Sequence, residues 1–113
     1  MARNEKLYIT DILNSIYKIE KYIKNTTFHE FCENDQIIDS VVRNLEIIGE
    51  AAKHISESTK NENKDIPWRQ IIGLRNMAIH EYFGLDNEII WKIITEELIL
   101  VKLKLEEINR SAV

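Results

Sequence analysis

The chain has 113 residues, 44% of them hydrophobic and 30% charged, which is the composition of a globular domain rather than a disordered or fibrous protein. No run of about 18 apolar residues could span a bilayer, and the polar N-terminus lacks the apolar stretch of a signal peptide, so we expect a cytoplasmic protein without a membrane partner. The net charge of −4 counts against broad nucleic-acid binding but permits a local site for a few phosphates.

The first half of the chain predicts two long helices, because its apolar residues recur at steps of three and four. Residues 5 to 25 form the first helix, and its core stripe starts at Tyr8. A short helical turn near Phe28 and Phe31 is expected to pack between this helix and a second one that starts at about Asp35. Gly49 lies within the second helix at a cost of up to about 1 kcal/mol relative to Ala, which indicates a close helix crossing.

The second half of the chain is divided by a polar stretch and a glycine. Residues 56 to 65 contain no apolar side chain and are expected to form a solvated loop. Pro67 fits the first position of a third helix that runs towards His80. Gly84 supplies a stop, and the last helix is predicted from Glu88 to about Asn109.

Short connections between long helices favour antiparallel neighbours. We therefore expect a single domain over residues 1–113, an all-α up-and-down four-helix bundle with one short extra helical turn. The apolar stripe of the last helix, which includes Trp91, Ile99 and Leu103, is wider than one core face requires. This width predicts a homodimer, with Trp68 and Trp91 in core or dimer contacts rather than stacked on bases.

The segment from Arg75 to Tyr82 reads Arg-Asn-Met-Ala-Ile-His-Glu-Tyr and places a cation, an amide, an imidazole and a phenol within about two helical turns. Arg offers a planar fork of donors to a phosphate, and His exchanges protons near neutral pH. The cluster therefore suits phosphodiester cleavage, in which Arg75 binds the phosphate and stabilises its growing charge. His80 would act as general base or acid, and Asn76 would orient His80 or donate a hydrogen bond to the phosphate.

The spacing Arg-x4-His-x-Tyr resembles the signature of the HEPN superfamily, and specifically of its HepT-like (DUF86-type) toxins. Two upstream segments agree with it. Residues 43 to 53 resemble a helix that these proteins carry some thirty residues before the motif, and residues 66 to 74 resemble their lead-in, where a Pro-Trp pair opens the motif helix. The resemblance covers about residues 7 to 108 and implies a HEPN-like homodimeric bundle. It also implies a metal-independent endoribonuclease, without a cofactor, that leaves a cyclic phosphate and a free 5′-OH.

The resemblance implies partners as well as a substrate. HepT-like toxins pair with a nucleotidyltransferase antitoxin of the MNT type, which in several systems adenylylates the motif tyrosine, here Tyr82. A homodimer would bring two motifs together and could complete an acid–base pair, and it could form a larger hetero-oligomer with the antitoxin. On residue chemistry alone, Tyr82 could instead pack its ring and hydrogen-bond at a helix end.

Several other polar residues leave alternatives open. Arg43 and Arg69 are candidate RNA-binding cations, and Arg43 and Glu50 either pair with neighbours or reach towards the active groove. His29 and His54 are expected to be structural. His29 and Cys32 have a spacing that could supply two metal ligands, but no further ligands complete the set and no metal is expected.

Within the motif, residues 77 to 79 are expected to be packing residues and Glu81 to be exposed. Two other functions compete with the ribonuclease. One is a catalytically silent HEPN module that dimerises and binds a nucleotidyltransferase, which the acidic net charge favours. The other is a plain structural helical dimer, which leaves the motif without a purpose.

Overall fold

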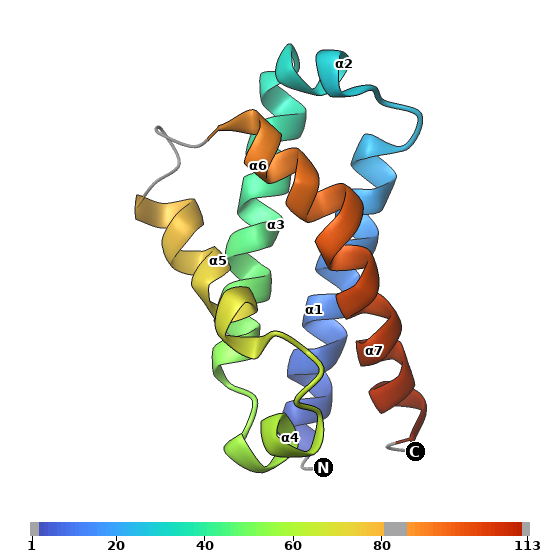
Figure 1. Ribbon diagram of the computed structural model, residues 1–113, viewed down its shortest axis with the longest axis vertical. Coiled ribbons are helices and arrows are strands. Elements are labelled where there is room, and N and C mark those ends of the chain that lie inside the picture. The colour runs from blue at the N-terminus through green and yellow to red at the C-terminus, as the bar shows by residue number, and fades with distance from the viewer. Residues whose placement is uncertain (1–2, 81–85, 112–113) are drawn as a thin grey trace.

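The computed structural model describes the backbone of residues 3–80 and 86–111 and the side chains of residues 4–79 and 86–111 (Figure 1). The regular elements of these residues are all helices, in the order α1 (Arg3–Ile23), α2 (Phe28–Cys32), α3 (Asp35–Lys53), α4 (Glu57–Glu62), α5 (Trp68–His80), α6 (Asn87–Lys92), the π-helical segment η2 (Ile93–Glu97) and α7 (Leu98–Ser111). Successive long helices run in opposite directions, and α3 packs against both α1 and α5 (Figure 1). The predicted all-α up-and-down bundle is confirmed.

The core is built from one apolar stripe on each long helix, as the spacing predicts. Its fully buried side chains are Ile9, Ile12, Ile16, Ile19, Phe31, Val41, Leu45, Ile48, Ile66, Ile90, Ile94 and Leu105. The stripe of α1 differs from the prediction at its start, because Ile9 is buried there and Tyr8 is only partly buried. The ring of Tyr8 is therefore free to contact a side chain nearer the surface.

The short helix α2, predicted to pack between α1 and α3, packs mainly against α3 and α6. Thr27 caps it in a reciprocal capping box with Glu30. Phe31 is fully buried, and its ring centroid lies 5.1 Å from that of Trp91. The contact between Phe31 and this aromatic side chain explains why α2 lies against α6.

The prediction of a loop over residues 56 to 65 was wrong, because part of it forms α4. The side chain of Ser56 caps this helix by accepting a hydrogen bond from the N–H of Thr59. Glu5 of α1 is buried and accepts hydrogen bonds from the Ser56 N–H and the Thr59 hydroxyl. A carboxylate distant in sequence thus holds a polar segment in a helical turn. The motif helix then starts at Trp68, one residue after Pro67.

The predicted last helix is continuous but contains a π-helical turn, η2, within it. A π turn shifts the buried face by about one residue relative to a regular α-helix. Beyond this turn Leu98, Val101 and Leu105 are buried, whereas Leu100 and Leu103 are 62% and 53% exposed. Of the extra apolar residues of the stripe, Ile99 and Leu103 therefore lie on the surface, whereas Trp91 packs against the core. No helix among the described residues is long and apolar enough to cross a membrane.

Candidate active site

The motif helix α5 meets α3 at a point where α3 has no side chain. A Cβ placed on Gly49 would overlap the backbone N of Arg75 and would lie 2.8 Å from its Cβ and 3.0 Å from its Cα. Real Cβ atoms do not approach other atoms this closely, so any other residue at position 49 would force the helices apart. The predicted close crossing at Gly49 is confirmed, and the residue that it brings against α3 is Arg75.

The next residue of α3 holds the guanidinium group. Arg75 Nε lies 2.8 Å from Glu50 Oε2, and the two side chains are 39% and 45% exposed. The contact is an ion pair rather than a hydrogen bond, because Glu50 Oε2 is buried without a hydrogen-bond partner among the described residues. An ion pair on the Nε side leaves the two terminal nitrogens of Arg75 for a bidentate contact with a phosphate. Of the two alternatives for Glu50, the structure shows both, because Glu50 reaches towards the motif and also pairs with a neighbour on its own side of α3.

Glu50 also connects Arg75 to a histidine outside the motif. Its Oε1 lies 3.4 Å from His54 Nε2, one helical turn further along α3. The ring of His54 stacks on that of Tyr8, with centroids 4.9 Å apart and an angle of 16° between the planes. His54, which was expected to be structural, is thus also linked through Glu50 to Arg75.

These residues surround a hollow of about 380 Å³ on the outer side of α3. Its lining comes from three helices and consists of Tyr8, Asp11, Arg43, Glu46, Ile47, Glu50, Ala51, His54 and Arg75. We call this the α3 hollow. A larger hollow of about 720 Å³, between α4 and the end of α7, contains none of the motif residues. The α3 hollow is therefore the one to which the sequence motif directs attention.

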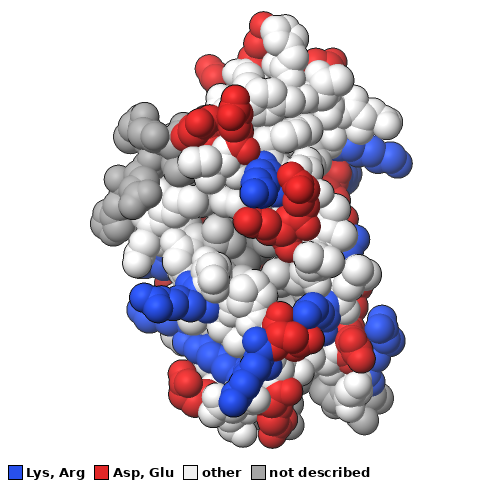
Figure 2. Space-filling model, viewed as in Figure 1, with Lys and Arg blue, Asp and Glu red and all other residues white. Residues whose placement is uncertain are grey.

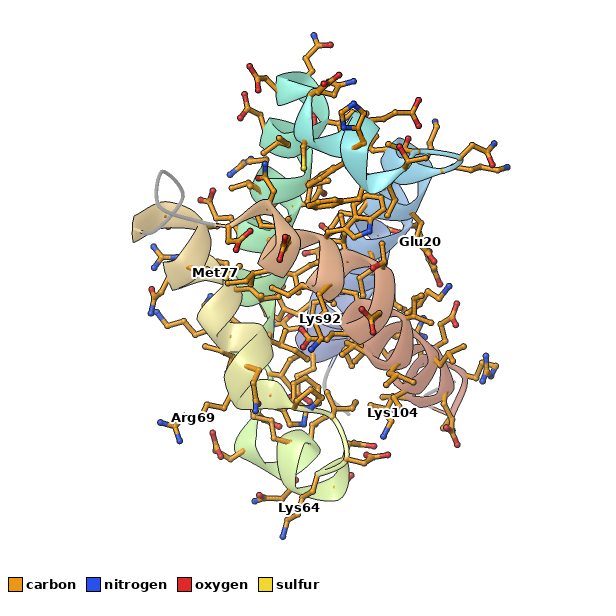
Figure 3. The ribbon with its side chains drawn as sticks, turned by 45° about the horizontal axis from the view of Figure 1, so that its top comes forward. Glu20, Lys64, Arg69, Met77, Lys92 and Lys104 are labelled. Atoms are coloured by element: carbon orange, nitrogen blue, oxygen red, sulfur yellow. The ribbon has the colours of Figure 1, made fainter. Side chains whose placement is uncertain are left out.

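The structure separates the two tentative RNA-binding arginines. Arg43 lines the α3 hollow, and its Nη1 lies 3.5 Å from Glu46 Oε1. Arg69 lines a different hollow with Lys60 and Lys64. Figure 3 shows Arg69 and Lys64 pointing away from the body of the molecule at this end, and basic side chains gather there over α4 and the start of α5 (Figure 2). Arg43 and Arg75 thus share a surface that Arg69 does not join.

The rest of the motif is described only in part. Asn76 is exposed on α5. His80 is the last residue of α5, but its side chain lies outside the described residues, as do Glu81 and Tyr82 entirely. Their predicted roles therefore stay predictions.

The three apolar residues inside the motif differ in burial. Ala78 is buried and Met77 is partly buried against the core. Ile79 is 42% exposed in the single chain, so packing within the chain accounts only for Met77 and Ala78. Packing of Met77 and Ala78 fixes the rotation of α5 about its axis and leaves Arg75 at the α3 hollow.

His29 and Cys32, considered above as two metal ligands, lie on α2 away from the α3 hollow. His29 Nε2 lies 3.2 Å from Glu33 Oε1 on the surface, and Cys32 is half-buried. Among the described residues no group of three or more His, Cys, Asp or Glu is placed to hold a metal ion.

The polar residues that line the α3 hollow from α3 have a regular spacing in the sequence. Arg43, Glu46, Glu50 and His54 follow one another at steps of three, four and four, which places them on one face of a helix. A polar stripe of this kind is usually a solvated surface. The stripe on α3 becomes the floor of a hollow because Tyr8 of α1 and Arg75 of α5 pack beside it.

A comparison with known protein families matches this chain to a ribonuclease family. The family model described as "Ribonuclease HepT-like" matches residues 12–108, which include the stripe of α3 and the motif of α5. The chain belongs to the HepT-like ribonuclease family. The resemblance that the three sequence segments indicated is thus confirmed, and family membership supports activity as a ribonuclease.

Individual HepT-like relatives cover nearly the whole chain. "Putative RNase MJ1380" of Methanocaldococcus jannaschii is 38% identical over 104 residues, 92% of this chain and 95% of the relative. "Probable ribonuclease HepT" of Thermococcus cleftensis is 36% identical over 110 residues, 97% of this chain and 100% of the relative. "Putative RNase TTE0752" of Caldanaerobacter subterraneus is 34% identical over 101 residues, 89% of this chain and 90% of the relative. The comparison with solved structures gave no match.

Proposed function

We propose that this HepT-like protein is a metal-independent endoribonuclease and the toxin of a toxin–antitoxin pair. The observation that carries the proposal is the placement of Arg75. Gly49 brings it against α3, Glu50 holds its Nε, and an open hollow lies beside it. A fixed, half-exposed guanidinium group suits a phosphodiester that gains negative charge as it reacts.

In the proposed reaction the substrate supplies its own nucleophile. His80 takes the proton of the ribose 2′-OH, whose oxygen attacks the adjacent phosphorus. The bond from phosphorus to the 5′-oxygen breaks, and that oxygen receives a proton from a general acid. The products are a 2′,3′-cyclic phosphate and a free 5′-OH. Arg75 binds the phosphate throughout, and Glu50 keeps the guanidinium group in position.

A second copy of the chain would supply the general acid. The motif has one histidine, so a homodimer that joins two motifs would hold two proton-transfer groups at one site. The exposed side chains of Leu100 and Leu103 support such an association. So does an apolar groove of about 360 Å³ between α5 and the last helix, lined in part by Ile71, Leu74 and Val101.

The proposed antitoxin is an MNT-type nucleotidyltransferase that adenylylates Tyr82. Added AMP would bring negative charge and bulk next to the motif, and Arg75 would offer it a counter-charge in place of RNA. The alternative function is a catalytically silent module that dimerises and binds the nucleotidyltransferase. In that case Arg75 and Tyr82 would form a recognition surface.

The decisive experiment is cleavage of labelled total RNA in EDTA by protein purified without its partner. Mass spectrometry first shows that Tyr82 is unmodified. We expect cyclic-phosphate products from the wild type, none from His80→Ala, and a loss of about 10²–10³-fold in rate for Arg75→Ala. Arg110→Ala, on the exposed surface of α7 and outside the α3 hollow, is the matched control. Equal inactivity of the wild type and His80→Ala, with nucleotidyltransferase binding intact in both, would establish the silent module instead.

A further inference from the structure

The charges of the α3 hollow do not suit a run of phosphates. Three carboxylates line it, those of Asp11, Glu46 and Glu50, against the guanidinium groups of Arg43 and Arg75. Both arginines already face a carboxylate, at 3.5 Å and 2.8 Å. One phosphate at Arg75 is compatible with this arrangement, but the rest of the hollow favours a neutral group that donates hydrogen bonds.

The stacked rings of Tyr8 and His54 give the hollow a flat surface. Tyr8 is partly buried, whereas the side chain of His54 is 48% exposed, so His54 is the outer ring of the pair. Bases of single-stranded RNA stack on aromatic and histidine rings of this kind. The volume of about 380 Å³ lies within the range of roughly 300–1,000 Å³ of small-molecule sites.

The ring of His54 and the guanidinium group of Arg75 both contact one carboxylate. Arg75 Nε lies 2.8 Å from Glu50 Oε2, and His54 Nε2 lies 3.4 Å from Glu50 Oε1. A nucleotide whose phosphate contacts the guanidinium group of Arg75 can therefore place its base on His54.

We propose that Tyr8 and His54 form the binding site for the base next to the scissile phosphate, and that guanine is the preferred base. This inference rests on the proposed ribonuclease function. Asp11 lies one turn after Tyr8 on α1 and lines the same hollow. The N1–H and N2–H₂ donors of guanine lie on one edge and match the two oxygens of a carboxylate. Uracil offers a single N–H between two carbonyl oxygens, which carboxylates repel.

The test uses DNA oligonucleotides that contain a single ribonucleotide, so that only one phosphodiester can be cleaved. Four substrates are compared. The nucleotides on either side of that bond carry guanine, hypoxanthine (the base of inosine), uracil or no base. We expect kcat/KM for guanine to exceed that of the abasic substrate by between about fivefold and about 150-fold, the range of base–aromatic stacking. His54→Ala should remove this preference, mainly through KM, whereas His54→Phe should retain stacking. Asp11→Asn should reduce the ratio of kcat/KM for the guanine substrate to kcat/KM for the inosine substrate.

His29→Ala and Tyr22→Leu are the matched controls, since both residues lie outside the α3 hollow, and neither should alter the preference. Equal kcat/KM for all four substrates, or a preference that survives His54→Ala, would overturn the base site and leave the ribonuclease intact. If the wild type cleaves none of them, fluorescence anisotropy with all-deoxy versions separates the two ideas. Tighter binding of guanine than of the abasic site would then keep the base site and reject the ribonuclease, and equal binding would reject both.

Discussion

Two histidine–glutamate pairs of this chain have the same spacing and different surroundings. On α2, His29 Nε2 lies 3.2 Å from Glu33 Oε1, and on α3, His54 Nε2 lies 3.4 Å from Glu50 Oε1. The side chains of the first pair are 82% and 69% exposed, and those of the second are about half exposed. Only the second pair is also in contact with two other helices, through Tyr8 and Arg75.

A histidine–glutamate pair at this spacing can therefore form on any helix. It becomes part of a candidate binding site only when side chains from other helices pack beside it. An exposed pair on one helix contributes little, because water screens it and both side chains lose freedom. Tyr8 of α1 contacts His54, and Arg75 of α5 contacts Glu50. These contacts limit the rotamers of the α3 pair and fix where its charges lie. The chain offers matched variants that test this contrast.

The largest effect is expected from a substitution of Gly49 in α3. Gly49→Ala should destabilise the fold by about 1–3 kcal/mol, because the new Cβ overlaps the backbone of Arg75 and the helices must separate. RNA cleavage should fall with it, since Arg75 moves away from Glu50. Urea denaturation and the cleavage assay measure the two effects.

Gly73→Ala is the control for that change. Nothing lies within 4 Å of a Cβ at position 73, so the substitution should stabilise the fold by up to about 1 kcal/mol through helix propensity alone. Equal unfolding free energies for the two alanine variants would contradict the close crossing of α3 and α5.

A smaller effect is expected from the two glutamates of the histidine pairs. Glu50→Gln should lower kcat by roughly threefold to tenfold, because the neutral amide holds Arg75 less firmly, while stability changes by less than about 1 kcal/mol. Glu33→Gln should leave cleavage unchanged. Single-turnover kinetics of both variants make the comparison. Equal rates for the two would show that Glu50 does not position Arg75.

The smallest effect concerns Glu5, a carboxylate used only for structure. Burial alone would raise the pKa of Glu5, but the hydrogen bonds from Ser56 and Thr59 together lower it below its ordinary value of 4.5. A lowered pKa in the folded state means that this carboxylate stabilises the protein above about pH 4.5 and that its contribution is lost as the pH falls through the folded pKa.

Glu5→Gln should therefore cost about 1 kcal/mol near neutral pH and little in acid. The difference in unfolding free energy between the wild type and this variant, measured from pH 7 down to pH 3, should shrink as the pH falls. A difference that stays constant with pH would contradict the lowered pKa. Cleavage at neutral pH should not change, because Glu5 lies at the other hollow.

The fold was largely predictable because local patterns control it. The steps of three and four in the apolar residues place α1, α3, α5 and the last helix. The observed bounds of α1 differ from the predicted ones by two residues at each end, and α3 begins at the predicted Asp35. The misses have tertiary causes. Helix α4 depends on Glu5, which is distant in sequence, and α2 follows the aromatic contact of Phe31 with Trp91.

The family and the motif can be identified from the amino-acid order, because the spacing of Arg75, His80 and Tyr82 is a property of the chain alone. The close crossing at Gly49 is indicated in the same way, since a glycine inside a long helix lowers helix stability. The packing of the helices sets which arginine lies on which surface, and it places His54 near Arg75. A hollow forms where three helices meet, and the sequence of one helix does not specify the rotation and register of its neighbours.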